Sequence, residues 1–171
     1  DPVDEVIRNC SPDWPGVVAD VDPDVAVLLL GGIAGVVPAP VDGEEVWPCE
    51  AAYDERWRER LTDAVDVLGA GGATVVLVTA PTTSMDAVKG EDPERFDARQ
   101  ACTNRVLEEV ARSQPGVHLV DLAGWTCFAW PVCSTEVDGV ELRPDGVHFT
   151  DDGAQVVARW MAPQLVEAAA G

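Results

Sequence analysis

An aspartate and a histidine near the C-terminus have the residue types and the spacing of an acid–base pair. Asp145 precedes His148 by three residues, and Gly146 between them allows a tight turn. In such a turn the carboxylate accepts a hydrogen bond from one imidazole nitrogen while the other nitrogen faces a substrate. The carboxylate then fixes the tautomer and stabilises the imidazolium that forms when histidine acts as a general base. Asp145 and His148 are therefore candidate catalytic residues; the alternative is a turn cap beside a packed histidine.

The elements that must position this pair follow an alternating pattern of strands and helices. Three apolar runs rich in valine and leucine predict buried parallel strands at residues 25–30, 74–79 and 117–122. Amphipathic patterns predict helices at residues 53–68 and 93–113, and a third helix that begins at Thr150 and is kinked by Pro163. This alternation is typical of right-handed βαβ units. The expected fold class is α/β, a three-layer sandwich with a parallel sheet and helices on both faces.

In open parallel sheets the active groups gather at the carboxyl ends of the strands. The candidate site is therefore expected where the loops after Leu30, Thr79 and Leu122 meet the turn that carries His148.

The residues that open the last helix, Asp145-Gly-Val-His148-Phe-Thr-Asp-Asp-Gly, resemble the fifth sequence block of the SGNH/GDSL hydrolase superfamily. Residues 25–32, 117–122 and 142–150 are similar to the extracytoplasmic SGNH domains that follow acyltransferase-3 membrane domains in bacterial O-acyltransferases. The resemblance implies a flavodoxin-like fold without a cofactor. It also implies a serine–histidine–aspartate triad that moves acyl groups on polysaccharides, with His148 as its base and Asp145 as its acid.

Two blocks of that family are altered in this chain. No Gly-Asp-Ser occurs, and the serines are Ser11, Ser84, Ser113 and Ser134. Where the family has an asparagine as oxyanion donor, this chain has glycines, so the resemblance leaves the backbone N–H groups of Gly31 and Gly32 as candidate donors. We expect residues 1–171 to form one SGNH-like domain that is N-terminally incomplete, lacks its first strand or strands, and has its nucleophilic serine outside this chain. A complete but catalytically dead relative is the competing interpretation.

Two tryptophans in the loop after the third predicted strand are candidate substrate-binding residues. Trp125 and Trp130 flank Cys127, and aromatic faces suit sugar rings as well as protein cores. Packing within the protein is the alternative reading of both side chains.

The five cysteines do not have the paired spacing of a structural zinc site, so no metal is expected. Cys127 and Cys133 are close enough to predict a small disulfide loop, which indicates an oxidising compartment. Cys102 lies in an apolar helical pattern and is predicted to be a buried free thiol. Cys10 and Cys49 are expected to pair with each other or with a cysteine outside this chain.

Composition narrows the classes of protein that remain. A chain of 171 residues with 47% hydrophobic residues fits one globular domain. The formal net charge of −20 repels phosphate backbones, which argues against nucleic-acid binding. The apolar runs are too short to cross a bilayer, and no signal-peptide pattern opens the chain. The proline-rich residues 36–48 are expected to form an irregular surface loop.

The sequence and the resemblance together predict an SGNH-type serine O-acyltransferase or esterase domain. Its expected partners are an acyl donor and a cell-surface or cell-wall polysaccharide acceptor, and it is expected to be extracytoplasmic, tethered through an upstream membrane acyltransferase domain. The alternative is a non-catalytic SGNH-like domain that binds glycan or has a structural role.

Overall fold

The centre of the fold is a parallel sheet of three strands. A computed structural model describes residues 13–30, 37–83, 92–129 and 131–170 of the chain. Strands β1 (Val25–Leu29), β4 (Thr74–Val78) and β5 (Val117–Val120) pair in the order β1-β4-β5, and both pairings are parallel. All three predicted strands are confirmed, and each ends one or two residues earlier than predicted. The α/β fold class is likewise confirmed.

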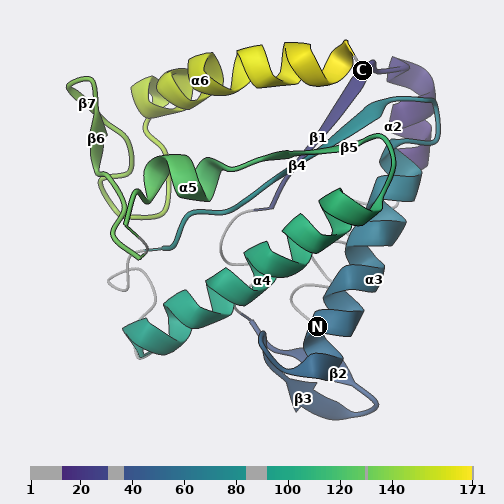
Figure 1. Cartoon of the computed structure of the whole chain (residues 1–171), viewed down its shortest axis with the longest axis horizontal. Helices are drawn as coiled ribbons and strands as arrows, with labels where there is room; N and C mark the ends of the chain where they lie inside the picture. The colour runs from purple at the N-terminus through teal and green to yellow at the C-terminus, as the bar shows by residue number, and fades with distance from the viewer. Residues whose placement is uncertain (1–12, 31–36, 84–91, 130, 171) are drawn as a thin grey trace.

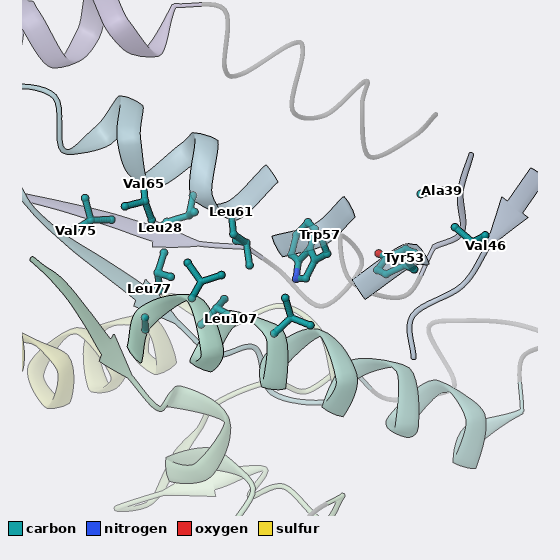
Figure 2. Close-up of a cluster of buried hydrophobic side chains, with 13 residues drawn as sticks. Leu28, Ala39, Val46, Tyr53, Trp57, Leu61, Val65, Val75, Leu77 and Leu107 are labelled. Carbon is teal, nitrogen blue, oxygen red and sulfur yellow. The ribbon is translucent and has the colours of Figure 1, made fainter. Parts of the chain in front are cut away.

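Helices cover both faces of this sheet. Helices α3 (Ala51–Leu68) and α4 (Pro93–Ser113) lie on one side and α6 (Asp151–Ala169) lies on the other (Figure 1). The side chains of alternate residues of β4 point to opposite faces of the sheet. Val75 and Leu77 pack in the cluster formed with α3 and α4, whereas Val76 and Val78 pack in the cluster formed with α6. Figure 2 shows the first cluster, with Leu77 of the sheet between the two helices.

The helix ends follow from local side chains. Asp92 accepts a hydrogen bond from the backbone N–H of Glu94 at the start of α4, and Pro93 occupies the first turn, where its missing N–H costs nothing. Helix α6 continues through Pro163 to Ala169. A further helix, α2 (Trp14–Val21), packs against α3 and was not predicted.

Two small hairpins lie outside the main sheet. Strands β2 (Ala39–Val41) and β3 (Glu44–Val46) pair antiparallel, as do β6 (Glu136–Val137) and β7 (Val140–Glu141). The prediction of an irregular loop at residues 36–48 is therefore wrong for residues 39–46. Each hairpin turns on an Asp-Gly pair with positive φ at both residues, the signature of a two-residue type I′ turn.

Two disulfides cross-link the described part of the chain. Cys127 pairs with Cys133, which confirms the predicted small loop. Cys49 pairs with Cys102, so the prediction of a free thiol at Cys102 is wrong, as is a pairing of Cys49 with Cys10. The cause is the packing of α3 against α4, which brings Cys49, just before α3, to the side of α4. Cys10 itself lies outside the described residues.

Within the described residues, no helix combines the length and the apolar character needed to span a bilayer.

Candidate active site

Asp145 and His148 form the hydrogen-bonded pair that their spacing predicts. Asp145 Oδ2 lies 2.7 Å from Nδ1 of His148, while Oδ1 accepts the backbone N–H groups of Val147 at 2.8 Å and His148 at 2.7 Å. Gly146 makes the turn at φ 73°, a conformation that costs glycine little. The imidazole, and after it the two backbone N–H groups, hold the pKa of Asp145 well below its usual range. The carboxylate is therefore ionised and oriented to hold the ring.

The loop that carries this pair is closed at its base. The backbone N–H of Thr150 donates to the carbonyl of Leu142 at 2.9 Å. The Thr150 hydroxyl donates to the carbonyl of Glu141 at 2.8 Å and accepts from the N–H of Gly153 at 2.8 Å. A Cβ atom on Gly153 would lie 2.7 Å from the carbonyl oxygen of Leu142, so only glycine lets α6 approach this closely. The helix start and the loop base therefore position His148 together.

A buried arginine ties the same turn to the segment after β4. Arg143 is 6% exposed, and its Nη1 donates to the carbonyls of Thr82 at 2.9 Å and Gly146 at 3.4 Å. Its Nε is buried and has no hydrogen-bond partner among the described residues. Burial lowers the pKa of Arg143, and the charge of Asp145 opposes that shift. Sequence reasoning missed Arg143, because an arginine beside a Pro-Asp-Gly turn gives no signal of burial.

The segment after β4 is held by side chains that sequence reasoning also missed. Asn104 of α4 accepts from the N–H of Ala80 at 3.0 Å and donates to its carbonyl at 2.8 Å. The hydroxyl of Thr79 donates to Asp121 at 2.7 Å and accepts from the N–H of Ala123 at 2.9 Å. These bonds fix the backbone that leads to Thr82.

His148 lines a pocket at the carboxyl edge of the sheet, which we call the apolar pocket. It has a volume of about 450 Å³. We call the Asp145–His148 pair the dyad. Most of the pocket wall comes from the ends of the three strands and from the loop that carries the dyad: Leu29, Leu30, Pro81, Leu122, Val147 and Phe149. The His148 side chain is 81% exposed, and its Nε2 has no hydrogen-bond partner among the described residues. An acyl group in this pocket would therefore lie beside the imidazole of His148.

A second cavity, the polar pocket, has a volume of about 270 Å³. Arg143 and Thr83 line both pockets, so the two cavities adjoin. The remaining polar wall of this pocket consists of Thr82, Asp97, Ser134 and Thr135, with Gly146 of the dyad turn.

The structure treats the other predicted site residues differently. Trp125 stacks on Trp160 with ring centroids 4.6 Å apart and packs against the core beneath α6, and it lines neither pocket. Gly31, Gly32 and Trp130 lie outside the described residues. Ser113 donates to the carbonyl of Val110 at the end of α4, and Ser134 lines the polar pocket. Ser11 and Ser84 also lie outside the described residues.

Among the described residues, no group of histidine, cysteine, aspartate and glutamate side chains is arranged to hold a metal ion.

Comparison with known proteins places this chain in a family. The chain matches the model of the GDSL-like Lipase/Acylhydrolase family over residues 7–156. Its fold is similar to that of the lipase/acylhydrolase from Enterococcus faecalis, with a TM-score of 0.58 and 18% identity over 90% of this chain and 68% of that one. No curated protein matches its sequence. Because the family model covers most of the residues, the chain belongs to the GDSL-like lipase/acylhydrolase family.

Proposed function

We propose that this chain supplies the base and the acid of a serine acyl-transfer site that acts on acyl groups of cell-surface or cell-wall polysaccharide. The observation that carries the proposal is the 2.7 Å hydrogen bond between Asp145 and His148 at the wall of an apolar pocket. Family membership supports acylhydrolase chemistry. Transfer to a sugar, the polysaccharide and an upstream acyltransferase-3 domain are parts of the proposal that rest on the sequence resemblance.

The proposed chemistry passes one proton back and forth through His148. Nε2 takes the proton of the serine hydroxyl as its oxygen attacks the acyl carbonyl, and gives it to the departing alkoxide. It then takes a proton from the acceptor hydroxyl, of a sugar or of water, and returns it to the serine when the acyl–serine bond breaks. Asp145 holds the Nδ1–H throughout and stabilises the imidazolium.

We place the nucleophilic serine outside this chain, beside β1. Neither described serine, Ser113 or Ser134, forms a hydrogen bond with His148. No described strand pairs with the outer edge of β1, and the side chains of Val27 and Leu29, on one face of this edge strand, are 43% and 48% exposed. A strand paired there would end near the apolar pocket, because Leu29 lines it. The N–H groups of Gly31 and Gly32, next along the chain, are the proposed oxyanion donors.

An extracytoplasmic location agrees with the chemistry of the chain. Two disulfides fit an oxidising environment. Tethering to a membrane domain is part of the proposal.

The test is labelling of the native protein, as its source makes it, with an alkyl fluorophosphonate, followed by intact-mass and peptide mass spectrometry. We expect one adduct on a serine outside these 171 residues, and labelling slowed by about 10³-fold or more in His148→Ala. His118→Ala is the matched control, since this second histidine is exposed on β5, away from the dyad, and should leave the labelling rate unchanged. An adduct that forms equally fast in His148→Ala would refute the assigned role of His148.

A second candidate function is a non-catalytic glycan-binding domain. It is favoured by the lack of a described serine hydrogen-bonded to the dyad. If this function is correct, no phosphonate adduct should form, and His148→Ala should leave the affinity for sugar unchanged.

A further inference from the structure

We propose that the polar pocket binds a neutral sugar ring and that the apolar pocket, on the other side of Arg143, receives the acyl chain. This division of the site rests on the proposed acyl-transfer function and names where each half of the substrate lies.

The walls of the polar pocket offer every kind of hydrogen-bonding group that a sugar uses. Asp97 only accepts hydrogen bonds, Arg143 only donates them, and the hydroxyls of Thr83, Ser134 and Thr135 do both. Sugar hydroxyls also donate and accept, so a sugar can pair with groups of each kind. An apolar ligand would displace water from these groups without replacing its hydrogen bonds, which is unfavourable.

Buried polar side chains show that this pocket is a built feature and not a surface irregularity. Arg143, Thr82 and Thr83 are each less than one tenth exposed. The hydroxyl of Thr82 donates a hydrogen bond to Asp97, and the backbone carbonyl of Thr82 accepts one from Arg143. Thr82 therefore holds both charged side chains in place.

The charges favour a neutral ligand. Asp97 and Arg143 give the lining of the pocket one negative and one positive charge, so it carries no net charge that would attract an anion or a cation. The chain as a whole carries a formal charge of −20, which further disfavours anions. The volume of about 270 Å³ lies just below the range typical of pockets for drug-sized ligands, which suits a single sugar ring.

The position of the two pockets relative to the dyad gives each a role. Gly146 lines the polar pocket, and its neighbours Val147 and His148 line the apolar one. A sugar held in the polar pocket would therefore present a hydroxyl across the boundary at Thr83 and Arg143 toward His148. Burial of the hydrocarbon part of the acyl group against the aliphatic wall of the apolar pocket would make binding more favourable.

The test is a titration of the 171-residue chain with methyl α-glucopyranoside, followed by backbone amide NMR. We expect saturable shifts concentrated at Thr83, Ser134, Thr135 and Gly146. Methyl α-glucopyranosiduronate, the same ring with a carboxylate, is expected to bind about tenfold or more weakly. Butyramide, an uncharged compound with the same acyl chain as butyrate, is the probe for the apolar pocket and is expected to shift Val147 and Phe149 instead.

Two variants test the assignment of the polar pocket. Asp97→Asn and Thr135→Val are each expected to weaken sugar binding about tenfold. Asp66→Asn and Thr62→Val are the matched controls on α3, remote from both pockets, and should bind like the parent chain. Circular dichroism of each variant checks its fold, and Thr135→Val provides the answer if Asp97→Asn does not fold.

The outcomes separate this inference from the proposed function. A lack of saturable shifts in the polar pocket, or tighter binding of the uronate, overturns the neutral-sugar assignment even where the native protein forms its phosphonate adduct. The assignment is supported if the sugar shifts the polar-pocket amides and the two variants weaken that binding. If no phosphonate adduct forms in the same protein, the serine mechanism fails but the assignment of the sugar pocket stands.

Discussion

Removing the disulfide between Cys49 and Cys102 should destabilise the protein far more than removing the one between Cys127 and Cys133. The first closes a loop with a sequence separation of 53, and the second a loop with a separation of 6. In the chain-entropy account, these lengths correspond to about 4 and about 2 kcal/mol of stability at room temperature. Against a total stability of roughly 5 to 15 kcal/mol, the larger loss is severe.

The assay is urea unfolding of the double variants Cys49→Ala/Cys102→Ala and Cys127→Ala/Cys133→Ala, followed by tryptophan fluorescence. The first should lose about 4 kcal/mol and show a larger m-value, because its unfolded chain is less restricted and exposes more surface. The second is the internal control, since it removes the same atoms from a short loop. An equal loss in both variants, or a greater loss in the second, would contradict the loop-length reasoning.

Four further predictions concern the site and the core. Asp145→Asn should lower kcat/KM of the native protein for ester turnover by about 10⁴-fold, and a loss of less than about tenfold would rule out its orienting role. Because the pKa of Asp145 is lowered, its bond to His148 should stabilise the turn above about pH 4 and weaken as the pH falls below that value, which the His148 ring signals report in NMR. Asn104→Ala should cost roughly 2 to 4 kcal/mol in urea unfolding, since it leaves both backbone groups of Ala80 without their partner; a change near zero would mean that water replaces the amide. Burial, and secondarily Asp54, raise the pKa of Tyr53 to about 12, so this single tyrosine should titrate about two units higher in the folded chain than in urea. The contribution of Tyr53 to stability should then be constant below about pH 10 and fall by roughly 2 to 3 kcal/mol as the pH rises toward 12, which tyrosinate absorbance and unfolding curves both measure.

The parts of the fold that depend on local periodicity could be predicted from the sequence. The helix at Pro93–Ser113 has the predicted bounds, because Pro93 at its start and Pro115-Gly116 beyond its end are strong local signals. The Asp145–His148 bond could also be predicted, since one turn makes it.

The features that were missed depend on contacts between distant segments. The Cys49–Cys102 pair follows from how α3 lies on α4, and the clamp of Asn104 on Ala80 joins α4 to the end of β4. The burial of Arg143 depends on the carbonyl of Thr82, which is remote in sequence. The β2–β3 hairpin is a different case: its Asp-Gly turn was a readable signal, obscured by the prolines around it.

The loop closed by the bond between Thr150 and Leu142 has a consequence for how the protein folds. Its contacts join residues that are close in sequence. Asp145 and His148 are three residues apart, and Leu142 and Thr150, which bond at the base of the loop, are eight apart. Contacts of short sequence separation form quickly, whereas the parallel pairing of β1 with β4 must wait for a long loop to close. The acid–base pair should thus appear early on the folding pathway, ahead of the sheet edge at which its substrate is expected to bind. Pulse-labelling hydrogen exchange would then find the amides of Val147 and Thr150 protected before those of β1.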